Sequence, residues 1–173
     1  MRISVLVGNP RPRSGTWDAA HRIAAGLGGD PVHGWDLADL GPGLLDPADA
    51  ATRTVEEDVC SADVLVVASP TYKATFTGLL KLFLDRLPTS TGLEGVVAVP
   101  LMRGGSPAHQ LAGELHLKPV LVELGATVPA PALFVLDKPA PTDTTEHDWL
   151  ARWQGVIERN VGPVGCGRPV SGR

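Results

Sequence analysis

The segment GNPRPRSGT, at positions 8–16, has the composition of an anion-binding loop. It leads directly into a stretch with helical spacing, so backbone amides and the positive end of a helix dipole would converge on one point. Its side-chain hydrogen-bond donors are Asn9, Ser14 and Thr16. Arg11 can add a charge-assisted contact, a set that suits a phosphate monoester better than a bridging pyrophosphate. The alternative is that Ser14 or Thr16 only caps the helix while Arg11 and Arg13 lie in water.

A second candidate site follows the clearest apolar run of the chain, DVLVVAS at positions 63–69. The residues that follow it are Pro70, Thr71, Tyr72 and Lys73. An aromatic side chain and backbone amides at a strand exit suit a planar ligand with a polar rim, such as the isoalloxazine ring of a flavin. The simpler interpretation is a half-exposed Tyr72 with a satisfied hydroxyl. Lys73 either attracts the phosphates of a nicotinamide dinucleotide or is one more solvated lysine.

The third candidate loop is MRGGSPAH, at positions 102–109. Gly104 and Gly105 would let the backbone approach a ring closely and present its amides to a carbonyl edge. Ser106 is placed to cap the helix that follows. His109 falls in the first turn of that helix and is equally well explained as a surface histidine, so it receives no catalytic role.

Five short strands and five helices must position these loops. Apolar runs bounded by turn residues predict buried strands at 2–7, 32–37, 63–69, 95–101 and 132–136. Helical spacing predicts helices over 14–27, 54–62, 77–87, 108–124 and from residue 145 onward. Pro70 is expected to end the third strand, Pro119 to interrupt the fourth helix, and Thr145 to open the last helix with a capping pattern. The stretch from Leu37 to about Ala51 is expected to be a surface loop.

This alternation predicts an α/β fold with a doubly wound, five-stranded parallel sheet covered on both faces. In such sheets, ligands bind at the carboxyl ends of the strands near the switch in strand order. The loops after the first, third and fourth strands are therefore expected to form one site.

The length and composition of the chain limit the classes of protein to which it can belong. With 173 residues we expect one domain over residues 1–162 and a disordered tail at 163–173. Cys60 and Cys166 are far apart and show no metal-ligand spacing, which indicates free thiols and no metal site. A formal net charge of −4 argues against a nucleic-acid partner. The lack of a signal peptide and of a long apolar run predicts a cytoplasmic protein without a membrane partner.

Together, the three loops resemble the NADPH-dependent FMN reductase family, especially the branch that supplies reduced flavin for alkanesulfonate use. GNPRPRSGT is similar to the GSPR-type phosphate loop of that family. PTYKATFTGLLKLFLDRLP resembles its PxYKxxxxGxLKxxLDxLP segment, and GGSPAHQLAGELHLKPVLVELGA resembles its GGxxAHxLAxxxxLKPVLxxL helix. The resemblance covers most of the chain.

The resemblance implies a flavodoxin-like, three-layer α/β/α fold that binds FMN and uses NADPH or NADH. The positions that hold the FMN phosphate correspond to Asn9, Arg11, Ser14 and Thr16. The positions that hold the ring correspond to Pro70, Thr71, Tyr72 and Lys73, with Gly104 and Gly105 in the third loop. Departures from the family pattern are Asn9 in place of a usual Ser, Gly15 in place of a common Ser or Arg, and Leu115 in place of a frequent Tyr.

The expected activity is hydride transfer from the nicotinamide C4 atom to the flavin N5 atom, which needs stacking and orientation more than a protein acid or base. Expected partners are FMN, the dinucleotide and a flavin-dependent monooxygenase, in a homodimer or homotetramer. Three alternatives remain on the sequence alone. They are a tightly bound FMN enzyme acting on quinones or azo compounds, a flavodoxin-like electron carrier, and a redox-silent interaction module.

Overall fold

The computed structural model describes residues 1–29 and 32–162, and the predicted tail at 163–173 lies outside the described residues. The sheet consists of β1 (Ile3–Val7), β2 (His33–Asp36), β3 (Val64–Pro70), β4 (Val97–Gly104) and β5 (Leu133–Leu136). All neighbouring strands are parallel, and their spatial order is β2-β1-β3-β4-β5. The expected five-stranded parallel sheet is confirmed.

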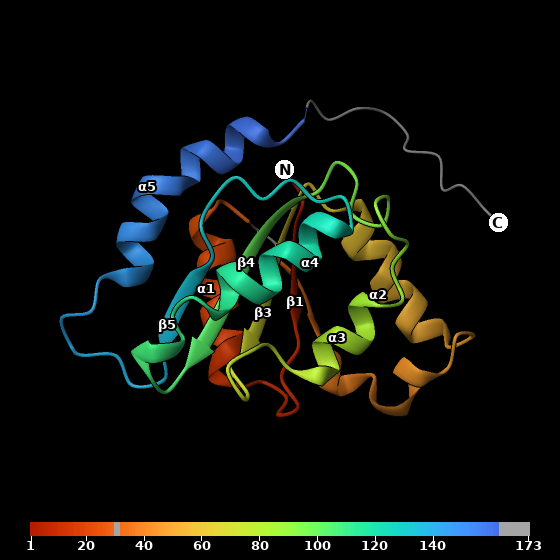
Figure 1. Cartoon of the computed structure of the whole chain (residues 1–173). Coiled ribbons are helices and arrows are strands. Elements are labelled where there is room, and N and C mark those ends of the chain that lie inside the picture. The colour runs from red at the N-terminus through yellow and green to blue at the C-terminus, as the bar shows by residue number, and fades with distance from the viewer. Residues whose placement is uncertain (30–31, 163–173) are drawn as a thin grey trace.

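Helices cover both faces of this sheet (Figure 1). The α-helices are α1 (Gly15–Gly26), α2 (Ala50–Ser61), α3 (Gly78–Leu84), α4 (Lys118–Glu123) and α5 (Thr145–Asn160). Shorter helical segments are Leu37–Asp39, Gly41–Leu45, Pro107–His109 and the π-helical turn Gly113–Leu117. Residues of α1 and α5 belong to one hydrophobic cluster, and residues of α2, α3 and α4 belong to the other. The molecule is therefore a three-layer α/β/α sandwich.

The three central strands β1, β3 and β4 are buried on both faces, which explains why they read as continuous apolar runs rather than as alternating patterns. All five residues of β1 are buried. Ile3 and Val5 contribute to the cluster under α1 and α5, and Leu6 contributes to the cluster on the other face. The side-chain alternation of a strand thus places apolar groups in both cores.

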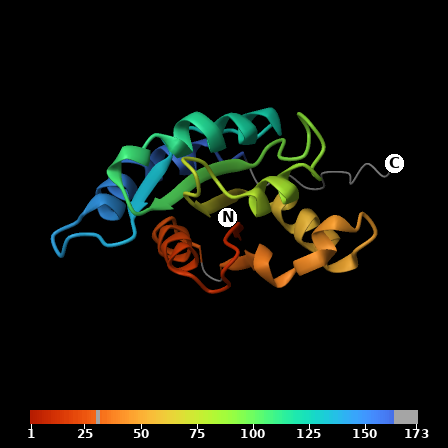
Figure 2. The same ribbon diagram turned by 60° about the horizontal axis from the view of Figure 1, so that its bottom comes forward.

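The switch in strand order falls at β1, which lies between β2 and β3. The chain leaves β1 for α1 and β2 on one side, and later enters β3 on the other side. The loops after β1, β3 and β4 all leave the same edge of the sheet, the lower edge in Figure 1, and Figure 2 turns this edge toward the viewer. The three candidate loops therefore meet where doubly wound sheets bind their ligands.

The sequence predicts that β3 ends before Pro70. In the structure, Pro70 is instead the last residue of β3 and pairs with Arg103. The N–H of the next residue, Thr71, donates to the Arg103 carbonyl oxygen at 2.7 Å. The nitrogen of Pro70 therefore faces the other neighbour, β1, because successive amides of a strand point to opposite sides. The pairing of β1 has already ended there with Val7 opposite Ala68, so the missing N–H breaks no hydrogen bond.

The helix predicted over 108–124 is interrupted, as expected. It consists of a short helical turn, the π-helical turn and α4, in which Pro119 occupies the first turn. The Lys118 N–H donates to the Gly113 carbonyl across the π-helical turn. Proline is tolerated at this position because its missing N–H lies in the first turn of α4.

One helix start and one helix cap differ from the sequence-based expectation, whereas α5 begins at Thr145 as expected. Helix α2 begins at Ala50 rather than Thr54, because the Asp49 side chain accepts a hydrogen bond from the Thr52 N–H at 2.7 Å and caps the helix earlier. The expected surface loop before it contains two short helical segments. At α5 the predicted capping by Thr145 is wrong, since the cap residue is Thr144 and its side chain makes no capping bond.

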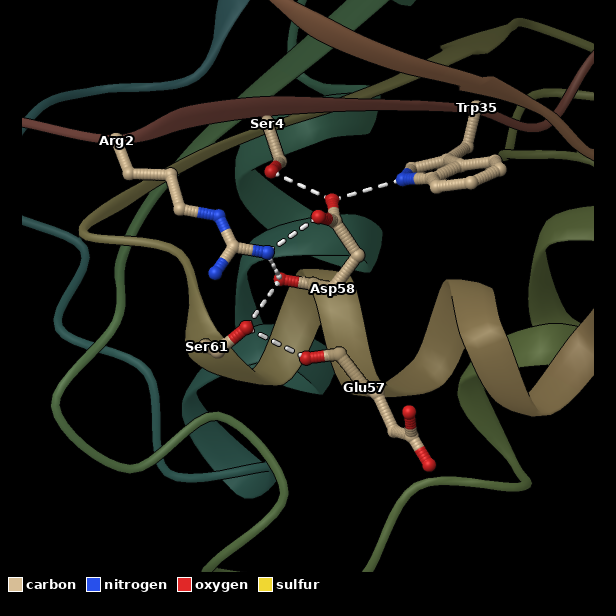
Figure 3. Close-up of polar contacts among 6 residues, drawn as sticks. All are labelled: Arg2, Ser4, Trp35, Glu57, Asp58 and Ser61. Atoms are coloured by element: carbon tan, nitrogen blue, oxygen red, sulfur yellow. Dashed lines mark hydrogen bonds and ion pairs between the residues drawn. The ribbon is translucent and has the colours of Figure 1, made fainter. Parts of the chain in front are cut away.

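The half-buried carboxylate of Asp58 joins α2 to the first two strands of the sheet (Figure 3). Asp58 of α2 accepts hydrogen bonds from the Ser4 hydroxyl at 2.7 Å and from the Trp35 indole N–H at 2.7 Å. Its other oxygen pairs with the Arg2 guanidinium. Burial raises the pKa of Asp58, but the bonds from Trp35, Ser4 and Arg2 outweigh it, so the pKa lies below its ordinary value. One side chain thus ties α2 to β1 and β2.

Cys60 is a half-buried free thiol, and burial together with nearby Glu56 raises its pKa to about 11. Cys166 lies outside the described residues.

Within residues 1–29 and 32–162, no helix combines the length and the apolar character needed to cross a membrane. Over the same ranges, no three side chains of His, Cys, Asp or Glu are grouped so that they could bind a metal ion.

Candidate active site

The loop after β1 is organised by the side-chain amide of Asn9, which is only 5% exposed. Its nitrogen donates to the Ser14 hydroxyl oxygen at 2.8 Å and to the Thr16 hydroxyl oxygen at 3.2 Å. Its oxygen accepts from the Arg11 backbone N–H at 3.0 Å, which fixes the orientation of the amide. Asn9 therefore faces into the loop and uses its own donors there.

This arrangement leaves two hydroxyl hydrogens available. Because the Ser14 and Thr16 oxygens accept from Asn9, their own hydrogens remain to be donated elsewhere. Ser14 is the residue that precedes α1, yet its side chain makes no capping bond. The alternative in which Ser14 only caps the helix is therefore not what the structure shows. Ser14 is half-buried and Thr16 is fully buried.

The two arginines of this loop differ in their surroundings. The Arg13 backbone, in the left-handed region at φ 50°, donates to the buried Asp36 carboxylate at 2.9 Å. The Arg13 guanidinium pairs with Asp39 at 3.1 Å and lies over the Trp17 ring at 4.1 Å. Arg11 is exposed, and its guanidinium has no ion pair among the described residues. Arg11 is thus available to a ligand. Asp36, at the end of β2, is a supporting residue that the local sequence pattern does not reveal.

The loop after β3 makes a tight turn between Tyr72 and Thr75, whose backbones exchange two hydrogen bonds of 2.8 and 3.2 Å. The two residues inside the turn, Lys73 and Ala74, have φ values of 52° and 67°. A left-handed conformation costs a non-glycine residue roughly 1–2 kcal/mol, and such strain clusters at binding sites. Tyr72 is 46% exposed, so this turn offers its aromatic side chain to a ligand.

A buried chain of hydrogen bonds joins the first two loops. The Thr77 hydroxyl donates to the Gly8 carbonyl at 2.5 Å and accepts from the Leu80 N–H at 3.1 Å. The Thr77 N–H donates to the Ser69 hydroxyl at 3.0 Å. Thr77 therefore caps α3 and holds the loop after β1 against the loop after β3. The sequence places Thr77 at a helix start, but its contact with Gly8 depends on the tertiary fold.

The third loop contacts the second where Gly104 faces Thr71. A Cβ built on Gly104 would lie 3.0 Å from the Phe134 ring and 3.2 Å from the Thr71 hydroxyl. That hydroxyl is buried and has no hydrogen-bond partner among the described residues. A buried polar group without a partner costs about 1–3 kcal/mol. These residues fit a flat ligand with a polar rim, because glycine permits the close approach and Thr71 lacks a partner.

Arg103 links the loop after β3 to the loop after β1. Its carbonyl oxygen holds the Thr71 N–H, and its guanidinium pairs with Asp137 at 2.9 Å. A Cβ built on Gly15 would lie 2.7 Å from the guanidinium carbon of Arg103. The only sequence signal for this residue is its position immediately before the two glycines of the third loop.

A cleft of about 570 Å³ lies beside the three loops, between α1, the end of β5 and the start of α5. Its polar wall includes Asp18, Arg22, Arg103 and Glu146. None of the ten residues predicted to bind the flavin lines it. Arg103 and Gly15 lie where this cleft and the anion loop adjoin.

The fold and the site together define a class of protein. The candidate anion loop after β1 and the candidate ring loops after β3 and β4 lie at the switch point of a five-stranded parallel sheet. This is the architecture of a flavodoxin-like, flavin-binding protein.

The sequence profile of the NADPH-dependent FMN reductase family matches residues 1–140. The chain belongs to this family. It is 40% identical over 132 residues to an FMN reductase (NADPH) of Escherichia coli K12, an alignment that covers 73% of this chain and 68% of the relative. It is 37% identical over 122 residues to an FMN reductase (NADPH) of Pseudomonas putida KT2440, with 63% of this chain and 61% of the relative covered. The chain thus spans about two thirds of the length of these relatives.

A solved structure leads to the same family. The apo form of the NADH:FMN oxidoreductase EMOB superposes with a TM-score of 0.77 and 34% identity, over 92% of this chain and 87% of the other. A flavodoxin, WrbA-like protein from Agrobacterium tumefaciens superposes with a TM-score of 0.65 and 16% identity, over 92% of this chain and 99% of the other. The second match supports the fold only. The predicted class, an oxidoreductase that uses FMN and a nicotinamide dinucleotide, is confirmed.

Proposed function

We propose that the three loops at the carboxyl edge of the sheet hold FMN while NADPH or NADH reduces it. The observation that carries the proposal is the buried Thr71 hydroxyl, which lacks a partner within the described ranges and faces Gly104. A ligand with a polar rim that enters beside these residues would supply the missing hydrogen bond. The ring of a flavin has such a rim.

In this proposal the loop after β1 binds the flavin phosphate. Ser14 and Thr16 direct their free hydroxyl hydrogens to the phosphate, and Asn9 holds both oxygens in place. Arg11, exposed and without an ion pair in the described part of the chain, adds a charge. The α1 N-terminus contributes backbone N–H groups and the positive end of its dipole.

The loops after β3 and β4 bind the ring. The proposed ring contacts are Pro70, Thr71, Tyr72, Lys73, Gly104 and Gly105. Tyr72 offers an exposed aromatic face from a turn whose geometry is set by two left-handed residues. When bound there, FMN would supply its N5 atom as the acceptor of the nicotinamide hydride. The contribution of the protein is to hold the ring and leave one face open for stacking, so we assign no catalytic acid or base.

Steady-state kinetics on protein stripped of flavin tests this function directly. NADPH or NADH is mixed with the protein, and the loss of absorbance of the reduced nicotinamide is followed while free FMN is varied. Rates that saturate with FMN are expected. An absence of nicotinamide oxidation at any FMN concentration would contradict the proposal.

We also propose that FMN exchanges as a substrate and that the reduced flavin passes to a flavin-dependent monooxygenase. The exposure of Tyr72 supports this, because an open platform favours release. The alternative is a retained FMN that passes electrons to a quinone or azo compound. Gel filtration of protein loaded with FMN separates the two: flavin that elutes apart from the protein supports exchange, and flavin that stays bound in full supports the alternative.

We further propose that the chain forms a homodimer or homotetramer through the helical segment after β4. Three large apolar side chains of this segment are exposed: Leu111 at 58%, Leu115 at 62% and Val122 at 54%. Exposed large apolar side chains gathered on one segment typically mark a contact surface.

We also propose a single domain over residues 1–162, which limited proteolysis tests. We propose a cytoplasmic location, which cell fractionation tests.

A further inference from the structure

Arg103 is held at the junction of two loops by contacts on both its backbone and its side chain. The guanidinium Nη1 pairs with the Asp137 carboxylate at 2.9 Å, and Nη2 donates to the Asp137 carbonyl oxygen at 2.9 Å. The side chain is 24% exposed, so its position is restricted by packing. The guanidinium occupies the space that a side chain at Gly15 would need. The guanidinium therefore already lies beside the loop after β1 before any ligand binds.

The charge of Arg103 adds to the positive potential at the start of α1. Gly15 is the first residue of α1, which has 12 residues. A Cα–Cβ bond in a helix tilts toward the N-terminus, so a group at the Cβ position of Gly15 lies toward the positive end of the helix dipole. The positive charge of Arg103 thus lies beside another partial positive charge. Asp137, which is 47% exposed, is the carboxylate that compensates it.

The guanidinium also retains hydrogen-bonding capacity. An arginine side chain has five N–H donors, and one of them, on Nη2, donates to the Asp137 carbonyl oxygen, while Nη1 forms the ion pair with the Asp137 carboxylate. The remaining donors have no partner within residues 1–29 and 32–162. Arg11, in contrast, is exposed and would have to be ordered when a ligand binds.

We propose that Arg103 binds the terminal phosphate of the flavin and is the main residue by which this protein prefers FMN to riboflavin. This inference rests on the proposed function. Asp137 positions the guanidinium and keeps it between the phosphate loop and the ring loop. A phosphate dianion at the start of α1 offsets both the charge of Arg103 and the helix dipole.

The test compares the dissociation constants of FMN and riboflavin, measured by quenching of flavin fluorescence without a nicotinamide. Riboflavin has the same ring and no phosphate, so its affinity reports on the fold and on the ring platform. The variants are Arg103→Gln and, as a matched control, Arg22→Gln. Arg22 lines the same cleft and pairs with Glu146 at 2.6 Å, and it lies two helical turns beyond the start of α1.

In Arg103→Gln, we expect the dissociation constant of FMN to rise about ten- to one-hundred-fold, the range of a charge-assisted contact. The constant of riboflavin should change less than about twofold, and Arg22→Gln should leave the preference for FMN intact. Equal weakening of FMN and riboflavin in Arg103→Gln would overturn the inference. So would an equal loss of preference in Arg22→Gln. Wild-type protein that binds neither flavin would instead refute the proposed function itself.

Discussion

Gly8 lies directly against Leu80. A Cβ built on Gly8 would be 2.4 Å from the Leu80 Cβ and 3.0 Å from the Leu80 Cα. The end of β1 therefore rests on the first turn of α3, where the Thr77 hydroxyl also bonds to the Gly8 carbonyl. These two contacts hold the loop after β1 against the start of α3.

We expect Gly8→Ala to lower the free energy of unfolding by about 1–3 kcal/mol, because the added methyl group meets backbone as well as side chain. Gly78→Ala is the matched control, since a Cβ there meets nothing within 4 Å and Gly78 lies in α3. That change should raise stability by about 0.5–1 kcal/mol. Urea denaturation measures both. Equal effects of the two substitutions would show that the Gly8 contact is unimportant.

Asn9→Ala should weaken FMN binding by about tenfold, because the Ser14 and Thr16 hydroxyls lose the donor that orients them. Riboflavin binding should change little, since in the proposed complex this loop contacts the phosphate and not the ring. Asn160→Ala, an exposed asparagine of α5, serves as the control. Fluorescence titration with both flavins measures the effect, and a parallel loss of riboflavin affinity would argue against the assigned role of Asn9.

The half-buried Asp58 makes the free energy of unfolding depend on pH. Its pKa in the folded protein lies below the ordinary value, so the ionised form adds stability above the unfolded pKa of roughly 3.9. This contribution is lost as the pH falls through the lower, folded-state pKa. The free energy of unfolding of the wild type should therefore decline in acid partly through this group.

Asp58→Asn should cost about 1–3 kcal/mol at neutral pH, because Arg2, Ser4 and Trp35 lose a charged acceptor. The gap between wild type and variant should narrow below about pH 4. Asp85→Asn is the control, since Asp85 forms an exposed pair with Lys81 and should change stability by less than about 0.5 kcal/mol. Urea titrations at two pH values provide the measurement. A gap that stays constant with pH would refute the role given to Asp58.

Leu115→Glu should shift the protein to a smaller assembly, because a charge placed in an apolar contact loses its hydration. Leu45→Glu is the control, since Leu45 is 72% exposed and lies between β2 and α2. Light scattering coupled to gel filtration measures the mass of each variant. If the Leu115 variant keeps the mass of the wild type, the helical segment after β4 is not the interface.

Most elements could be predicted from the sequence because their signals are local. Buried strands appear as apolar runs, and the interruption before α4 follows from Pro119. The sequence-based predictions fail where contacts between residues distant in sequence determine the local structure. Pro70 stays in β3 because β1 has already ended, and α2 starts early because Asp49 caps it. The capping expected at Thr145 fails because the side chain of Thr144, the residue before the helix, makes no capping bond.

The sequence by itself determined the parallel α/β architecture, the three loops and the family, because periodicity and motif spacing are properties of neighbouring residues along the chain. Only the tertiary structure decided which distant groups meet at these loops. Asp36 holds the Arg13 backbone, and Arg103 reaches Gly15, because the strand order β2-β1-β3-β4-β5 brings these strand ends to one edge. Residues that are far apart in sequence acquire their electrostatic roles only from that order.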